Sequence, residues 1–159
     1  MSGDRVVVPP GCAPLPGAFN VTVRVRSEHT GGVLSVIEET LPPKSFIVPH
    51  VHRNDVWVYV LSGEVGVLVG EVIATAASGE WALKPRDVEH AMWNASPDPA
   101  RIVEVLTPGG GERWFEEIAV LADDDRQAFD DACRRHGIVF FPHSPWATTI
   151  CTRFGLREG

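Results

Sequence analysis

From Phe19 to about Ala77 the chain alternates apolar and polar residues at a period of two, and Gly, Pro, Asn and Asp interrupt this alternation at short intervals. Successive side chains of a β-strand point to opposite faces, so the pattern predicts short strands with one buried face. We expect strands at Phe19–Arg26, Gly32–Leu41, Asp55–Leu61, Glu64–Val72, Ala91–Trp93 and Arg101–Leu106. Strands this frequent without intervening helices indicate a sandwich or barrel and disfavour a parallel sheet with crossover helices.

The pattern changes after Thr107–Gly111. Large apolar residues from Trp114 to Leu121 recur at helical spacing, and Asp124–His136 carries an apolar stripe that ends before Gly137, as a helix with a glycine stop would. We therefore expect two short helices that pack on the barrel. The expected division is an extended arm at residues 1–18, a barrel at 19–111, and C-terminal helices and tail at 112–159.

Composition excludes several classes of function. The net charge is −7 with only 14 Lys and Arg, whereas binding a phosphate backbone requires clustered basic residues. No apolar run approaches the roughly 20 residues that span a bilayer. We expect a soluble cytoplasmic protein with neither nucleic acid nor membrane as a partner. Cys12, Cys133 and Cys151 lack CxxC spacing and are expected to be reduced thiols without a chemical role.

Three histidines are candidates for a common metal site. His50 and His52 flank one residue, so on an extended strand their imidazoles point the same way. His90 follows a turn at Pro85 and Asp87 that can present a third imidazole on a later strand. Neutral imidazole suits zinc, iron, copper and nickel, so the set predicts one divalent transition metal.

Two segments resemble the paired motifs of the cupins. The first motif is Gly, His-x-His, Glu and Gly, and it falls on Lys44, His50, His52, Val56 and Gly63. The second is Gly, Pro-x-Gly, His and Asn, and it falls on Gly79, Pro85, Asp87, His90 and Asn94. Seven of these ten positions match in type, and all the spacings hold. The resemblance implies an all-β cupin jelly-roll β-barrel with a metal in its wide mouth.

The tail that begins at Thr107 is similar to that of the quercetin dioxygenase-like cupins. The resemblance covers about residues 19–137 and also implies a homodimer, which open sheet edges and a proline-rich N-terminal arm favour as well. Asn94 matches a motif position, but we interpret it as an amide that stabilises a turn.

The departures from the family pattern bear on mechanism. Val56 occupies the position of the family's carboxylate ligand and has the parity that faces inward, whereas Asp55 has the opposite parity. Lys44 and Asp87 replace family glycines, so the turns there can differ from those of the family. Val56 is expected to line the substrate pocket. Among the tryptophans, Trp57 and Trp81 favour core or rim positions, while Trp93, close to His90, is the candidate for that pocket.

Without the carboxylate, three neutral imidazoles leave the charge of a divalent metal uncompensated in an apolar barrel, which favours an anionic oxygen chelator as substrate. The resemblance implies a dioxygenase-like enzyme with Fe(II), and Zn or Ni stands next. Alternatives are a non-redox cupin such as an aromatic polyketide cyclase or isomerase, and a non-catalytic small-molecule-binding cupin. Glu38 or Glu39 could face the cavity as a base, and the residue pattern leaves that choice open.

Overall fold

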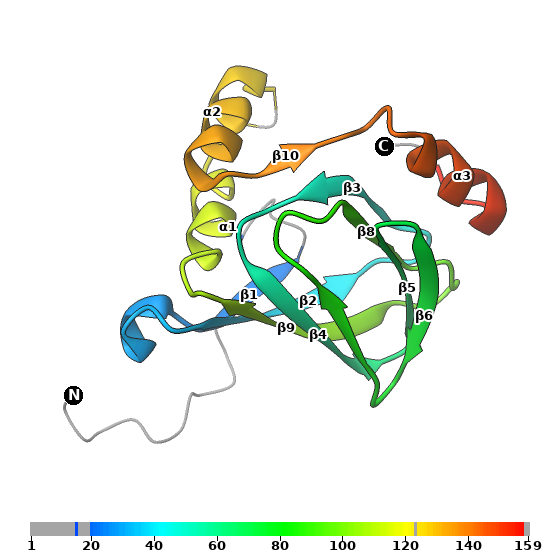
Figure 1. Ribbon diagram of the computed structural model, residues 1–159, viewed down its shortest axis with the longest axis horizontal. Coiled ribbons are helices and arrows are strands. Elements are labelled where there is room, and N and C mark those ends of the chain that lie inside the picture. Colours follow the sequence, from blue (N-terminus) through cyan, green and yellow to red (C-terminus); the bar gives the residue numbers. More distant parts are fainter. Residues whose placement is uncertain (1–14, 16–19, 123, 158–159) are drawn as a thin grey trace.

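The computed structural model describes residues 15, 20–122 and 124–157, and within them two antiparallel five-stranded sheets face each other (Figure 1). The first sheet has the order β1 (Val21–Val25), β2 (Ser35–Leu41), β9 (Ala100–Thr107), β4 (Asp55–Ser62) and β7 (Trp81–Lys84). The second has the order β10 (Val139–Phe140), β3 (Phe46–Val51), β8 (His90–Trp93), β5 (Glu64–Val69) and β6 (Val72–Ala77). The predicted jelly-roll β-barrel is confirmed.

The core between the two sheets consists of the inward-facing side chains, which alternate along each strand with outward-facing ones. In β2 every second residue is buried, and β9 buries its even-numbered residues in the same way. Most of these inward side chains are apolar and pack with their counterparts on β4, β5 and β8, which removes apolar surface from water. Two inward residues are glutamates, Glu39 of β2 and Glu104 of β9, and both are buried.

Each expected strand overlaps an observed one, but β7 and β10 were not expected, and one expected strand is divided at a hairpin. The run Glu64–Val72 is not one strand, because the chain turns at Gly70, which adopts a positive φ of 59°, and returns as β6. The alternation of β6 is weak because it is an edge strand, and only Ala76 of its residues is buried. A 3₁₀ helix, η1 (Ser27–Thr30), joins β1 to β2.

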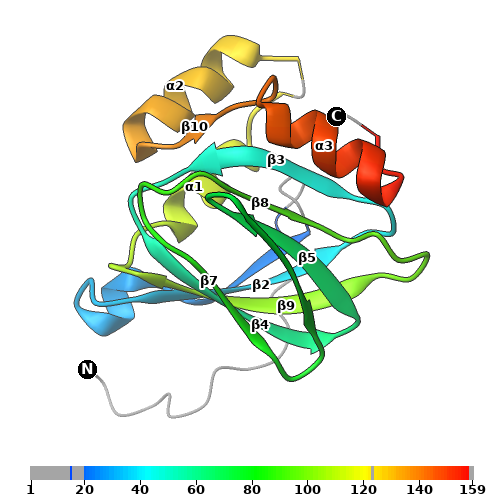
Figure 2. The ribbon, with the colours of Figure 1, turned by 45° about the vertical axis from the view of Figure 1, so that its right-hand side comes forward.

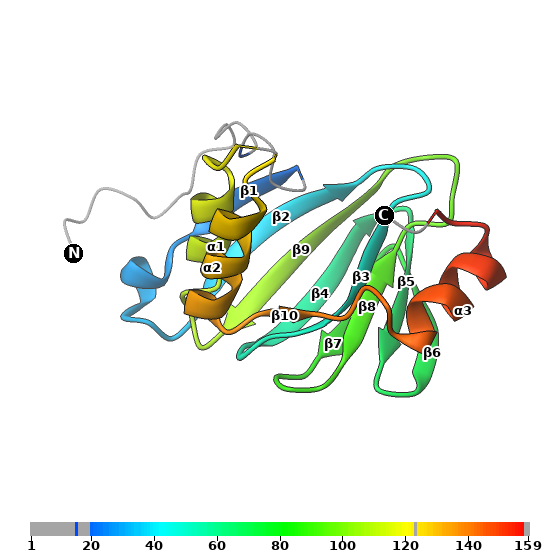
Figure 3. The same cartoon turned by 90° about the horizontal axis from the view of Figure 1, so that it is seen from above.

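Within residues 112–122 and 124–157, which the structure describes, three α-helices follow the barrel: α1 (Glu112–Ile118), α2 (Arg126–His136) and α3 (Pro145–Phe154). The two helices expected from the sequence correspond to α1 and α2, which lie together at one end of the first sheet (Figure 3). The third was not expected; Ser144 caps it, Pro145 occupies its first turn, and it packs on the second sheet (Figure 2). No helix among the described residues is both long and apolar enough to cross a membrane.

The carboxylate of Glu112 ties the start of α1 to η1. Its Oε1 accepts hydrogen bonds from the backbone N–H of Ser27 at 2.8 Å and from the Ser27 hydroxyl at 2.6 Å. Its Oε2 accepts from the backbone N–H of Gly110 at 2.9 Å. Because Glu112 is 1% exposed, these bonds are shielded from water and fix where α1 leaves the barrel.

Part of the predicted organisation lies outside the described residues. Of the expected arm at residues 1–18 only Leu15 is described, and it packs against the core. The division into arm, barrel and tail therefore stays a prediction. Cys133 and Cys151 are buried thiols, and Cys12 is not among the described residues.

The turns at Lys44 and Asp87 keep the backbone that a glycine favours. Their φ angles are 58° and 59°, in the left-handed region. The sequence allowed different turns at these positions, but the structure retains a left-handed residue in both. A side chain with a Cβ is disfavoured there because it crowds the following carbonyl oxygen.

We expect the free energy of unfolding of Lys44→Gly to be about 1 kcal/mol higher than that of Lys44→Ala. Glycine removes the strain of the left-handed backbone, whereas alanine retains it. Alanine is the matched control, since both substitutions remove the hydrogen bond from Lys44 Nζ to the Ala95 carbonyl. Urea unfolding measures the difference, and equal stabilities would contradict the assignment of strain to this position.

Candidate metal centre

The imidazoles of His50, His52 and His90 meet at one point of the second sheet. His50 lies in β3 directly opposite His90 at the start of β8, and His52 follows the end of β3. One ligand nitrogen from each ring lies within 4.8 Å of the other two. The Nε2 atoms of His50 and His90 are 3.1 Å apart. The structure thus brings together the three histidines that the sequence singled out.

Backbone carbonyls orient all three rings. Each Nδ1 lies within hydrogen-bond distance of a carbonyl oxygen two residues away: Val48 for His50 at 2.8 Å, Asn54 for His52 at 2.9 Å, and Val88 for His90 at 2.8 Å. A carbonyl oxygen only accepts, so each Nδ1 must carry the proton and each neutral ring keeps a lone pair on Nε2. This arrangement fixes the tautomer and the ring direction, as partners of metal-ligating histidines do.

The donor set fits a transition metal. Two nitrogens bound at about 2.1 Å to one metal stand about 3.0 Å apart at a right angle and about 3.4 Å apart at a tetrahedral angle. The 3.1 Å between His50 Nε2 and His90 Nε2 falls in this range. Two lone pairs that face each other without a proton between them repel, and a cation between them removes that repulsion. Ligation itself stays a prediction, and the geometry supports it.

Electrostatics keep the rings in the neutral, ligating form. Burial, followed by the nearby charge of Lys84, lowers the pKa of His50 to about 3 and that of His52 to about 4. Burial and then the neighbouring His50 hold the pKa of His90 far below its usual range. A metal therefore does not have to displace protons from these rings at neutral pH.

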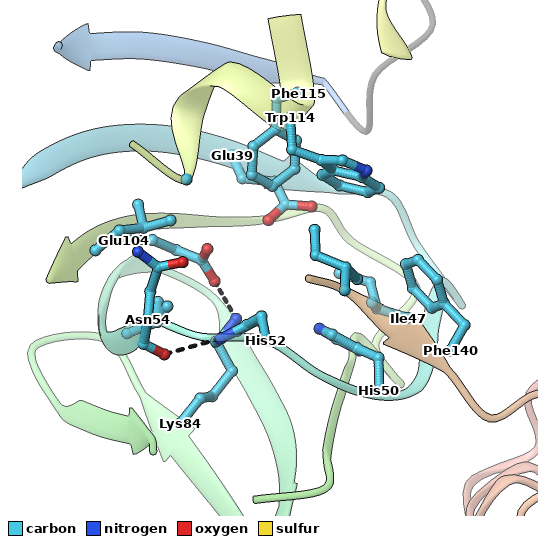
Figure 4. Close-up of a pocket in the computed structure, with 14 residues that line it drawn as sticks. Glu39, Ile47, His50, His52, Asn54, Lys84, Glu104, Trp114, Phe115 and Phe140 are labelled. Carbon is cyan, nitrogen blue, oxygen red and sulfur yellow. Dashed lines mark hydrogen bonds and ion pairs between the residues drawn. The ribbon is translucent and has the colours of Figure 1, made fainter. Parts of the chain in front are cut away.

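A cavity between the two sheets opens onto this cluster (Figure 4). His50 and His52 line it, and His90 is fully buried beside them. Its walls are otherwise mostly apolar, and the C-terminal tail contributes Gly111, Trp114, Phe115, Ile138 and Phe140. The cavity volume is about 60 Å³. The cavity suits a small molecule.

Three charged or acidic residues also line the cavity, from the first sheet. Lys84 Nζ donates to Glu104 Oε1 at 2.5 Å, and these two residues are 4% and 3% exposed. They flank β4, where Lys84 pairs with Val56 and Glu104 with Val58. Glu39 of β2 is 4% exposed. The apolar barrel expected from the sequence therefore also contains a buried ion pair and a buried acid.

Glu39 and Glu38 have opposite environments. Glu38 lies on the outer face of the sheet, where it forms ion pairs with Arg24 and Arg101. Glu39 faces inward, and burial followed by repulsion from Glu104 raises its pKa to about 8, against the opposing effect of Lys84. Of these two residues, Glu39 is therefore the one that faces the cavity, and its carboxyl group is mainly protonated and neutral at pH 7.

The alternation of the strands contained the signal for Glu39, which the sequence analysis left as one of two choices, and for Glu104, which it missed. Glu39 shares the parity of Ile37 and Leu41, and Glu104 that of Ile102 and Leu106, which are all buried. A charged residue in phase with buried apolar neighbours indicates an inward-facing polar group.

Val56 lies on the cavity wall, as expected from its parity. Asp55 points outward and pairs with Arg86, so it does not replace the missing carboxylate. Asn94 stabilises a turn as predicted, since its amide donates to the carbonyls of Leu41, Pro42 and Asp98.

The prediction that Trp93 lines the substrate pocket is wrong. Within β8, His90 and Met92 face the barrel interior, so Trp93 must face the other side of the sheet. There it is buried among residues of α3, including Ile150, and its ring lies 4.9 Å from that of Phe154, centroid to centroid. A Cβ on Gly66 would approach the Trp93 ring to 2.0 Å, so the ring occupies the space that this glycine leaves open.

Comparisons with known proteins agree with this architecture. A family model described as a cupin domain matches residues 37–106. No curated protein matches the chain in sequence. KdgF from Halomonas sp. is similar in structure with a TM-score of 0.52 and 16% identity, over 58% of this chain and 81% of that one.

Two further solved structures have similar scores. One, described as a predicted oxalate decarboxylase from Thermotoga maritima, has a TM-score of 0.53 and 17% identity, over 55% of this chain and 78% of that one. Salicylate 1,2-dioxygenase from Pseudaminobacter salicylatoxidans has a TM-score of 0.51 and 18% identity, over 57% of this chain and 28% of that one. At such identities the likeness shows a shared fold.

We expect Glu104→Leu to lower the free energy of unfolding by about 3–5 kcal/mol, because it leaves the Lys84 ammonium buried without its partner. The double variant Lys84→Met/Glu104→Leu should be more stable than Glu104→Leu alone, since no unpaired charge remains. Denaturant titration of the three proteins measures this coupling. The exposed pair of Asp55 and Arg86 is the control, and Asp55→Asn should have little effect. A double variant no more stable than Glu104→Leu would contradict the interpretation.

Proposed function

Because the chain belongs to the cupin superfamily through its cupin domain at residues 37–106, we propose that it is a metal-dependent enzyme, an oxygenase of the dioxygenase-like kind, acting on a small enolic or aromatic metabolite. The observation that carries this proposal is the convergence of three neutral imidazoles, each with Nε2 free, on one wall of a buried cavity.

His50, His52 and His90 would hold one divalent transition metal, with Fe(II) as the first candidate and Zn or Ni next. When bound, such a metal supplies Lewis acidity and, in the case of iron, redox chemistry with dioxygen. The fold shared with salicylate 1,2-dioxygenase supports the oxygenase assignment.

The residues around the histidines suit an anionic ligand that chelates through oxygen. Lys84 and Glu104 neutralise each other, and the three imidazoles are neutral, so the chain leaves most of the charge of a divalent cation to be balanced by the ligand. Trp114, Phe115 and Phe140 give the cavity apolar walls, which strengthens electrostatic interactions within it. The small volume favours compact enols and β-diketones.

A second candidate is a non-redox cupin, such as an isomerase or an aromatic polyketide cyclase. Glu39 favours this possibility, because an acid with a pKa near neutrality on the wall of a cavity is suited to proton transfer.

The homodimer and the cytoplasmic location expected from the sequence also stay proposals. Light scattering tests the homodimer.

His52→Ala should lower metal content from about one ion per chain to less than about a tenth of that, because two imidazoles alone do not complete a site. Elemental analysis of protein purified without chelators measures this. His29→Ala is the matched control, since His29 is exposed and does not belong to the cluster. Unchanged metal content in His52→Ala would show that the site is elsewhere.

The oxygenase and the non-redox enzyme differ in their need for dioxygen. Protein loaded with Fe(II) should consume oxygen with some member of a panel of flavonols and β-diketones, and His52→Ala should not. Turnover by zinc-loaded protein under strict anaerobiosis would favour the non-redox candidate. No oxygen uptake across the panel would count against the oxygenase.

A further inference from the structure

Glu39 is the one buried acid of the cavity that the proposed metal site leaves without a partner. It is 4% exposed and lines the cavity, and among the described residues its carboxyl group makes neither a hydrogen bond nor an ion pair. Figure 4 shows this carboxyl group pointing into the cavity. A carboxyl group that faces a cavity without a protein partner is available to a ligand that binds there.

The position of Glu39 places it across the cavity from the histidines. It belongs to β2 of the first sheet, whereas His50 and His90 belong to β3 and β8 of the second. A ligand held at the histidine cluster would therefore lie between the imidazoles and this carboxyl group. Val56, at the position of the family's carboxylate, carries no charge, so Glu39 is the acid available to such a ligand.

The groups that face Glu39 determine how it responds to a cation. On its own side of the cavity are Glu104 of β9 and Lys84 of β7, which form an ion pair. On the other side are the neutral rings of His50 and His52, and α1 and β10 contribute only apolar side chains to the wall. A divalent cation in this poorly solvated space would be the strongest nearby charge and would favour the ionised carboxylate.

We propose that Glu39 gives up its proton when a divalent cation enters the three-histidine cluster, so that the loaded site contains a carboxylate facing the ligand. The carboxyl O–H bond breaks, its electron pair stays on the carboxylate, and the proton passes to bulk water. This inference rests on the proposed metal site and deepens it in two respects. The residual charge of the loaded site becomes +1, which matches a monoanionic chelator, and the site gains the base that Val56 does not provide.

The thermodynamic linkage between proton release and metal binding predicts whether metal affinity rises or falls with pH. If binding releases a proton from Glu39, metal affinity rises with pH over the range in which the free protein keeps that proton. The rise should approach tenfold per pH unit between about pH 6 and pH 7.5. The rings of His50 and His52 are already neutral over this range, so they do not produce such a rise.

Calorimetry of nickel(II) binding tests the inference without any assay of activity. At pH 7, titrations in buffers of different ionisation enthalpy report the number of protons released per bound ion. We expect close to one proton for the wild-type protein and close to none for Glu39→Gln, whose affinity should also be nearly independent of pH. Glu39→Asp keeps a carboxyl group and should restore the release.

Glu38→Gln is the matched control, because Glu38 neighbours Glu39 in sequence but lies on the outer face of the sheet with Arg24 and Arg101. It should release as many protons as the wild-type protein. If nickel binds and Glu39→Gln releases as many protons as wild type, the inference about Glu39 is overturned while the metal site stands. If nickel does not bind the wild-type protein, both the metal site and the inference are overturned.

Discussion

The antiparallel pairing of β3 with β8 is the constraint on which the rest of the site depends. It sets His50 opposite His90, and the register between the two strands shifts between Ile47 and His50, so β3 carries one extra residue there. This bulge contains Pro49, which cannot donate to the ladder. Because of the extra residue, both Ile47 and His50 face the cavity although they are three positions apart.

The two sheets contribute different chemistry to the same space. The second sheet supplies three neutral imidazoles that are held by backbone carbonyls, and the first supplies Glu39, Lys84 and Glu104. A ligand between the sheets would meet nitrogen donors on one side and an acid with an adjacent ion pair on the other. The separation matters because an acid within ligand distance of the metal would become a fourth ligand, whereas one across the cavity is free to exchange protons with the substrate.

The C-terminal tail supplies part of the cavity wall at the mouth of the barrel. Glu112 anchors α1 through Ser27, which brings Trp114 and Phe115 over the cavity, and β10 pairs with β3 so that the Phe140 ring lies 5.2 Å from that of His50, centroid to centroid. The tail also explains the burial of Trp93, because α3 covers the outer face of β8. The helical segments after the barrel therefore shape both the site and the core.

The sequence by itself determined the β architecture, the three histidines and the inward position of Val56, because alternation and motif spacing are local properties of a chain. It did not determine that Trp93 faces away from the site or that Lys44 and Asp87 keep left-handed turns. The position of Trp93 depends on which face of β8 the opposite sheet and α3 cover. Only the tertiary structure could place Glu39, Lys84 and Glu104 in one cavity with the histidines, since these residues come from three different strands and their pKa values and ion pairing arise from shared burial.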